Sequence, residues 1–175
     1  MSVYLITDTH FEHERLRLHC GRPEGYEETI LGSISRMIRP EDVLIHLGDF
    51  CWRHDSLWHE RYFSCAKSKN WLVIGNHDGK SAESYVARGW DWVGESCTLK
   101  IDGRIILFSH KPQAIPAEVD LNIHGHLHNS SEEDQRSNEP EVHSLITKRH
   151  ILLAIEHTGY KPVSLKGLLK AALII

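Results

Sequence analysis

The sequence predicts an α/β fold whose strands lead into polar side chains at one edge of a sheet. Five short runs rich in β-branched residues and leucine each lead into an aspartate, an asparagine or a histidine. Nearly continuous apolar runs of this length are typical of strands that are covered on both faces. A segment with helical apolar spacing separates the first two runs, and the later part of the chain is richer in strands.

Each of the five predicted strands ends at a candidate metal ligand. The strands span residues 3–7, 43–47, 71–74, 105–109 and 121–124, and they lead into Asp8, Asp49, Asn76, His110 and His126. In open α/β sheets the carboxyl ends of adjacent strands converge on one crevice, which is where ligands bind. We therefore expect these side chains to share one site.

The helices are predicted from apolar spacing and from their end signals. Residues 27–39 place apolar side chains at helical spacing, begin with acids and end with arginines before Pro40, which indicates an amphipathic helix. Further helices are predicted within residues 56–66 and 80–88. Ser164 is expected to cap a last helix with leucines on one face.

The remaining segments are predicted as a hairpin, a loop and a strand. Residues 97–101 and 104–108 flank Asp102-Gly103, a strong two-residue turn signal. The acidic stretch 129–141 is predicted to be a solvated, mobile loop, and residues 150–156 return as a strand. Neither a repeat nor a linker divides the chain, so residues 1–175 are expected to form one domain.

Composition excludes several classes of protein. Apolar residues make up 41% and charged residues 25%, which excludes a disordered or fibrous chain. The net charge of −4 excludes a uniformly basic surface that coats nucleic acid. Four cysteines without C-x-x-C spacing and the absence of a basic leader indicate a reduced, cytoplasmic protein. Since no apolar run approaches about 20 residues, no membrane span is expected.

Seven oxygen and nitrogen ligands follow the predicted strand ends. They are Asp8, His10, Asp49, Asn76, His110, His126 and His128. One zinc ion takes four protein ligands in a structural site and three in a catalytic site. Seven groups are therefore too many for one such ion, and they suit two metals that share one carboxylate. By contrast, His46, His124 and His143 are interpreted as hydrogen-bonded core or surface residues.

These residues resemble the calcineurin-like metallophosphoesterases. The family's motifs D-x-H, G-D-x-x-x-R, G-N-H-D/E, G-H and G-H-x-H occur in that order. They correspond to Asp8-Thr9-His10, Gly48-Asp49 with Arg53, Gly75-Asn76-His77-Asp78, Ser109-His110 and Gly125-His126-Leu127-His128. Ser109 replaces the usual glycine, which we expect to be tolerated because that position supplies no ligand. Residues 8–13 and 160–165 are similar to a small bacterial and phage branch of the family.

The resemblance implies a fold and a set of residue roles. The fold would be a four-layer α/β/β/α sandwich of the metallo-dependent phosphatase type. The implied first metal ligands are Asp8, His10 and His128, the second metal ligands are Asn76, His110 and His126, and Asp49 bridges. His77 would donate a proton and be oriented by Asp78, while Arg53 would face the phosphate. The implied activity is dinuclear hydrolysis of a phosphate ester by a metal-bridging hydroxide, with a diester preferred over a monoester.

The mixed shell of imidazole, carboxylate and carboxamide suits two divalent transition metal ions. Manganese is preferred, with iron, zinc, nickel or cobalt as substitutes. Cys51 is interpreted as an inert buried thiol. Two roles stay open for each group of residues around the motifs. Glu12 and His13 contact substrate or are structural, and Arg15, Arg17 and Arg22 form a phosphate funnel or are solvated charges. Phe50, Trp52 and Trp58 form a platform for a nucleobase or pack in the protein.

Two other functions compete with this interpretation. A non-catalytic protein-binding scaffold on the same fold should lack some site residues, yet all seven ligands and His77 are present. A mononuclear zinc hydrolase of the lactamase type would need an H-x-H-x-D-H string, which is absent. The expected partner is a phosphate ester, either a nucleotide, a cyclic diester or a nucleic-acid end. Residues 151–153 and 173–175 are candidates for a homodimer contact.

Overall fold

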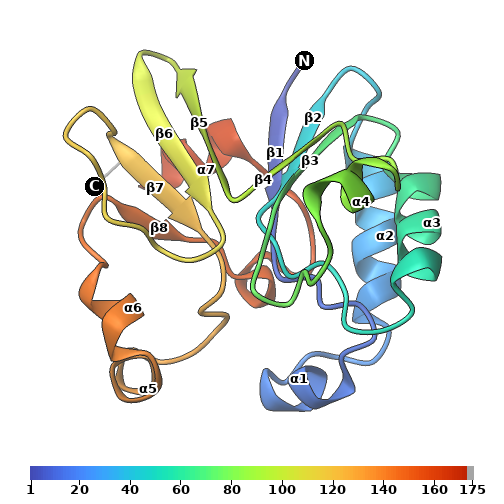
Figure 1. Ribbon diagram of the computed structural model, residues 1–175, viewed down its shortest axis with the longest axis horizontal. Coiled ribbons are helices and arrows are strands. Elements are labelled where there is room, and N and C mark those ends of the chain that lie inside the picture. The colour runs from blue at the N-terminus through green and yellow to red at the C-terminus, as the bar shows by residue number, and fades with distance from the viewer. Residues whose placement is uncertain (173–175) are drawn as a thin grey trace.

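Two β-sheets face each other in the computed structural model, which describes residues 1–172 (Figure 1). The first sheet contains β1 (Val3–Ile6), β2 (Val43–His46), β3 (Lys69–Val73), β4 (Trp92–Gly94) and β9 (Val163–Ser164) in the order β4-β3-β2-β1-β9. The second sheet contains β5 (Ser96–Ile101), β6 (Arg104–Ser109), β7 (Leu121–His124) and β8 (His150–Leu152) in the order β5-β6-β7-β8.

Helices flank the two sheets. They are α1 (Glu14–His19), α2 (Tyr26–Met37), α3 (Asp55–Cys65), α4 (Ala82–Val86), α5 (Glu132–Asn138), α6 (Pro140–Ser144), α7 (Leu165–Ala172) and a 3-10 helix, η1 (Ile155–Thr158). Helices α2 and α3 cover the outer face of the first sheet, while α5 and α6 lie beside the second sheet (Figure 1). The predicted mixed α/β fold is confirmed.

Parallel pairing brings the strand ends to one edge of the molecule. Strands β1, β2, β3 and β4 run parallel to their neighbours in the first sheet, and β6, β7 and β8 run parallel in the second. The carboxyl ends of β1, β2 and β3 therefore lie at the same edge, close to α1 in Figure 1. This placement collects the segments that follow each strand.

Alternating side chains of the first sheet pack into two different hydrophobic cores. Leu44 packs with Ile30 and Ile34 of α2 in the core between this sheet and its helices. The neighbouring residue Ile45 points the other way and packs with Phe108 of β6 in the core between the sheets. Because a strand places successive side chains on opposite faces, one continuous apolar run serves both cores.

The predicted hairpin and the last helix cap are confirmed. Strands β5 and β6 pair antiparallel with Ile101 opposite Arg104, and both residues of the turn, Asp102 and Gly103, have positive φ angles. Positive φ at both positions is what a type I′ hairpin turn requires. At the other end of the chain, the Gly167 amide donates to Ser164 Oγ at 3.1 Å, just where α7 begins.

Two predicted segments differ from the structure, and two short elements were not predicted. The segment 129–141, predicted as a loop, contains α5 and begins α6, because the Ser131 hydroxyl caps α5, acids occupy its first turn and Pro140 opens α6. The strand predicted over 150–156 ends at Leu152 and gives way to η1. Helix α1 and strand β4 were not predicted, since α1 has only six residues and β4 only three.

All four cysteines are free thiols. Among residues 1–172, no helix is long and apolar enough to cross a bilayer. Residues 173–175, one half of the predicted dimer contact, lie outside the described part of the chain.

Candidate metal centre

Main-chain hydrogen bonds tie together the loops that carry the candidate ligands. The Asp8 amide donates to the Gly48 carbonyl at 2.9 Å, and the His10 amide donates to the Asp49 carbonyl at 3.0 Å. These bonds extend the pairing of β1 with β2 beyond the strands. The first two motifs are therefore held side by side as one unit.

The backbone around the candidate ligands is strained. Five of the seven have left-handed φ angles, namely Asp8 at 49°, His10 at 42°, Asp49 at 56°, His126 at 73° and His128 at 49°. Such conformations cost on the order of 1–3 kcal/mol each and persist only where the surroundings fix them. Strain concentrated at one point of a fold marks this edge as a functional site.

Buried hydrogen bonds hold the strained backbone of the first motif in place. The Arg22 guanidinium donates to the carbonyls of Asp8 and Thr9, and the Tyr26 hydroxyl donates to the His10 carbonyl at 2.6 Å. His46, interpreted from the sequence as a core histidine, accepts from the Gly48 amide and is hydrogen-bonded to Thr9 Oγ1 at 2.9 Å. Burial lowers the pKa of His46 to about 3, so it stays neutral and structural.

Two glycines of the motifs leave no room for a side chain. A Cβ on Gly75 would overlap the Asp49 carboxylate, and a Cβ on Gly125 would overlap the Thr7 hydroxyl and the Asp8 carboxylate. Glycine at these positions lets the backbone approach the buried carboxylates closely. This contact explains why a glycine precedes Asn76 and His126.

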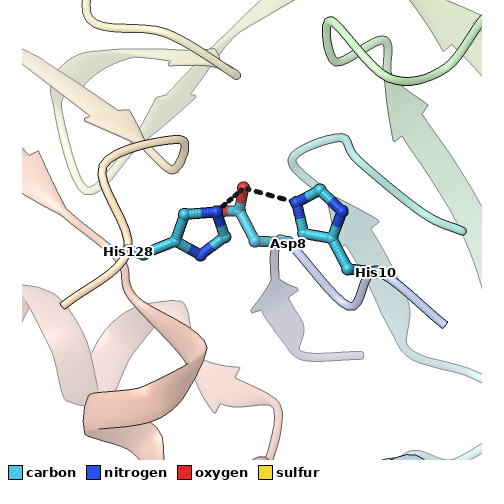
Figure 2. Close-up of side chains that lie close together, drawn as sticks. All are labelled: Asp8, His10 and His128. Atoms are coloured by element: carbon cyan, nitrogen blue, oxygen red, sulfur yellow. Dashed lines mark ion pairs between the residues drawn. The ribbon is translucent and has the colours of Figure 1, made fainter. Parts of the chain in front are cut away.

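The first cluster of candidate ligands comprises Asp8, His10 and His128. The two imidazoles approach the Asp8 carboxylate from opposite sides (Figure 2), and each Nε2 lies 3.9 Å from Oδ1. One ligand atom from each residue lies within 4.8 Å of the other two. Asp8 is fully buried, and its carboxylate also accepts hydrogen bonds from the Thr7 hydroxyl and the His126 amide.

A second cluster comprises Asp49, His110 and His126, whose ligand atoms also lie within 4.8 Å of one another. Asn76 belongs beside it, because Asn76 Oδ1 is 3.0 Å from His110 Nε2. His110 Nδ1 lies 2.8 Å from the Leu47 carbonyl, to which it donates. A neutral His110 therefore turns its Nε2 lone pair toward the oxygens of Asp49 and Asn76.

Asp49 links the two clusters. Its Oδ2 lies 3.3 Å from His10 Nε2 and 3.3 Å from His110 Nε2, while its Oδ1 accepts from the His77 amide at 2.8 Å. Burial favours the neutral acid, but the His10 and His110 imidazoles outweigh it and hold the pKa of Asp49 well below its usual range. One buried carboxylate thus faces both ligand sets.

The residues of both clusters fit divalent cations. His10 Nε2 is buried and has no hydrogen-bond partner within residues 1–172, although two carboxylates face it. Burial lowers the pKa of His110, yet Asp49 and Asp8 outweigh burial and raise it to about 9. Without a cation, a proton on His110 offsets the negative charge of the buried carboxylates. A bound cation would take over that role and leave His110 neutral.

His128 is held by a buried ion pair that sequence reasoning did not find. Its Nδ1 lies 3.3 Å from Glu156 Oε1, and the same oxygen accepts from Arg22 Nη2 at 2.7 Å. An imidazole whose other nitrogen is bonded to a carboxylate is a typical metal ligand. A lone acid at the end of the apolar run 150–156 was the available signal. Arg22 is 2% exposed, which contradicts both its roles considered from the sequence, a phosphate funnel and a solvated charge.

His126 has a comparable partner in Glu139. His126 Nε2 lies 2.7 Å from Glu139 Oε2, so Nδ1 is the ring atom left for a metal. Glu139 lies between α5 and α6, in the segment predicted to be a solvated loop. No local sequence signal pointed to this contact, because charge alone marked the segment as exposed.

Asp78 has different partners from those the family resemblance implied. Its carboxylate is buried and accepts from the amides of Asp49, Phe50 and Gly75 at 2.8–2.9 Å. It therefore fixes the two ligand loops rather than the His77 ring, which corrects the expected orienting role. His77 is exposed, and its ring centroid is 5.3 Å from that of His10.

The remaining residues singled out from the sequence divide between core and groove. Phe50 and Trp58 are buried, which is the packing role, whereas Trp52 is exposed. Arg53 lies with Trp52 in a groove beside the clusters, and its contact with a phosphate stays a prediction. Arg17 is paired with Glu14, and Arg15 lines the same groove as Arg53.

The ion pair between Glu156 and His128 should make the free energy of unfolding depend on pH. Burial raises the pKa of Glu156, but His128 and Arg22 outweigh it and lower the pKa to about 2 from 4.5. The ionised side chain therefore contributes about 3 kcal/mol above pH 4.5, and this contribution disappears as the pH falls through 2. Glu156→Gln should destabilise the protein by about that amount at pH 7 in urea unfolding, and the difference from wild type should shrink below pH 4.5.

The control for Glu156 is Glu132→Gln, which removes the acid of an exposed ion pair with Arg136. It should change the unfolding free energy by less than about 0.5 kcal/mol, because exposed pairs contribute little. A Glu156→Gln difference that does not vary between pH 7 and pH 2 would contradict the depressed pKa.

Two proteins are similar to this chain over almost its whole length. MJ1445, an uncharacterized protein of Methanocaldococcus jannaschii, is 26% identical over 181 residues, which cover 97% of this chain and 90% of the relative. The crystal structure of AQ665, a protein of unknown function from Aquifex aeolicus, superposes with a TM-score of 0.77 at 27% identity, covering 97% of this chain and 98% of that one.

The family assignment rests on a match that contains all five motifs. The family described as the calcineurin-like phosphoesterase superfamily domain matches residues 1–144. That span includes both ligand clusters and the Asp49 carboxylate between them. It confirms the resemblance drawn from the motifs alone. The chain belongs to the calcineurin-like phosphoesterase superfamily.

Proposed function

We propose that this protein is a phosphodiesterase that depends on two divalent metal ions. The observation that carries the proposal is the position of Asp49, whose Oδ2 lies equally close to His10 of one cluster and His110 of the other. A shared carboxylate between two ligand sets is the arrangement that a two-metal hydrolase needs. Membership of a phosphoesterase superfamily supports the same reaction class.

The proposed ligand assignment follows the two clusters. Asp8, His10 and His128 would hold one ion, Asn76, His110 and His126 would hold the other, and Asp49 would contact both. Nitrogen and carboxylate ligands without thiolate favour manganese, with iron, zinc, nickel or cobalt as substitutes. Two bound cations supply a lowered pKa for water and offset the negative charge that develops on a phosphate.

His77 is the proposed proton donor for the leaving group. Its main-chain amide is anchored on Asp49 Oδ1 at 2.8 Å, while its side chain is exposed at the mouth of the site. The imidazole can therefore reach a substrate oxygen without being a ligand itself. Asp78 supports this position indirectly, because it fixes the backbone of Asp49 and Gly75.

Activity should depend on metal and on Asp49. Chelation should abolish hydrolysis of a phosphodiester, and manganese should restore it best. Asp49→Asn should cost more than Asp8→Asn, and more than the 10–100-fold or so typical of residues that only support a ligand. The measurement is turnover of a diester with and without added manganese, together with metal content.

Glu60→Gln, an exposed change from carboxylate to amide on α3, is the matched control and should leave turnover unchanged. Activity that survives exhaustive chelation would contradict the proposal. So would an Asp49→Asn variant with normal metal content and normal turnover. Absence of hydrolysis in the manganese-loaded protein would favour a binding scaffold on the same fold.

His77→Ala should separate substrates by their leaving group. A poor alkoxide leaving group needs a proton in the transition state, whereas an acidic nitrophenol does not. We expect a loss of about 10²–10⁴-fold on a nucleoside diester and a much smaller loss on a nitrophenyl ester. Metal content should be unchanged, because the ring is not a ligand.

His157→Ala removes an exposed histidine outside both clusters and serves as the control. Equal losses on the two leaving-group classes would rule out proton donation by His77. Loss of metal from His77→Ala would instead make His77 a ligand.

A further inference from the structure

An exposed tryptophan stands beside the metal centre. Trp52 is 47% exposed, whereas Trp58 and Trp90 are buried and the other two tryptophans are half-buried. An exposed indole offers a flat apolar face on which a planar ligand can stack. Trp52 lies three residues after Asp49, and its main-chain amide donates to the Phe11 carbonyl at 2.9 Å, which holds it beside the first motif.

One face of this ring is already occupied. The His13 imidazole stacks on Trp52 with centroids 4.2 Å apart and planes 5° apart. The His77 ring is 5.2 Å from Trp52 and 6.1 Å from His13, so it lies at the edge of the stack and not over its free face. The indole face opposite His13 is therefore open to a ligand.

The open face is within reach of a substrate phosphate at the metal ligands. His77 contacts Trp52 on one side, and its ring centroid lies 5.3 Å from that of His10 on the other. A single histidine ring thus separates the tryptophan from the first cluster. A nucleotide spans a gap of this size between its phosphate and its base.

The groove around Trp52 contains two arginines that have no carboxylate partner within residues 1–172. Six residues line it, namely Glu12, His13, Glu14, Arg15, Trp52 and Arg53, around a volume of about 530 Å³. Its two acids are engaged, Glu12 with His54 and Glu14 with Arg17. Arg15 and Arg53 form no salt bridge or side-chain hydrogen bond within residues 1–172. An aromatic face in a groove with two unpaired guanidinium groups suits a base that carries a phosphate.

We propose that this groove is a nucleobase subsite, in which a base of the substrate stacks on Trp52 while Arg15 and Arg53 contact a flanking phosphate. The inference rests on the proposed phosphodiesterase function and names its substrate class, a diester that carries a nucleoside. Stacking on an aromatic side chain tolerates every base, so the subsite recognises nucleotides without reading their sequence.

The test compares a dinucleotide with its abasic counterpart, which has the same sugar-phosphate backbone and leaving group. Trp52→Ala should raise KM about 5- to 150-fold on the dinucleotide, the range measured for loss of one stacked base. It should leave the abasic diester unaffected, and Trp52→Phe should retain most of the affinity. Leu57→Ala, a truncation of another exposed apolar side chain, is the control and should change neither.

A second readout measures binding without turnover. Calorimetric titration should give tighter binding of adenosine monophosphate than of ribose 5-phosphate to wild type, and Trp52→Ala should remove that difference. A short single-stranded oligonucleotide, assayed beside the dinucleotide, distinguishes a nucleic-acid end from a free nucleotide as the source of the base. Whichever of the two shows the larger Trp52→Ala effect is the source.

Failure of the subsite and failure of the proposed function give different results. Wild-type enzyme that hydrolyses both diesters equally, with equal losses in Trp52→Ala, would overturn the subsite and leave the phosphodiesterase intact. Wild-type enzyme that hydrolyses neither diester with manganese bound would overturn the function on which the subsite rests.

Discussion

Three carboxylates are buried at the carboxyl ends of the strands, and the architecture of this edge follows from their need for partners. Asp78 is satisfied by three main-chain amides, which fix the loops after β2 and β3 to each other. Asp8 and Asp49 accept only some of their possible hydrogen bonds from amides and a hydroxyl. Imidazoles face their other oxygen atoms. Since burying an unpaired carboxylate costs several kcal/mol, the strained loops persist because they deliver those partners.

The same requirement extends outward to a second ring of groups. Glu156 and Arg22 form a buried pair behind His128, and Arg22 also binds the carbonyls of the first motif. Glu139 has the corresponding position behind His126. These contacts fix which nitrogen of each imidazole faces inward, and that choice decides whether the ring can bind a cation. Main-chain amides bound to Asp78 therefore fix the ligand loops, and the acids Glu139 and Glu156 orient the histidine rings.

Much of this edge could be predicted from local sequence because the signals are local. A buried parallel strand is a short apolar run, and the residue after it must lie at the sheet edge, so Asp8, Asp49 and His110 were found by the strands before them. The Arg22–Glu156 pair joins residues 134 positions apart, and the lone acid at the end of the apolar run 150–156 does not identify Arg22 as its partner. Helices α1, α5 and α6 are short, and such segments depend on tertiary contacts more than on propensity. The orienting role that the family resemblance implied for Asp78 was wrong, because its carboxylate accepts from three main-chain amides, which the motif alone cannot show.

The central proposal for this protein is that two metal ions share the Asp49 carboxylate. Anomalous diffraction from crystals grown with manganese tests it directly. We expect two manganese peaks, one among Asp8, His10 and His128 and one among Asn76, His110 and His126, with Asp49 contacting both. A single peak, or a second peak that Asp49 does not contact, would contradict it.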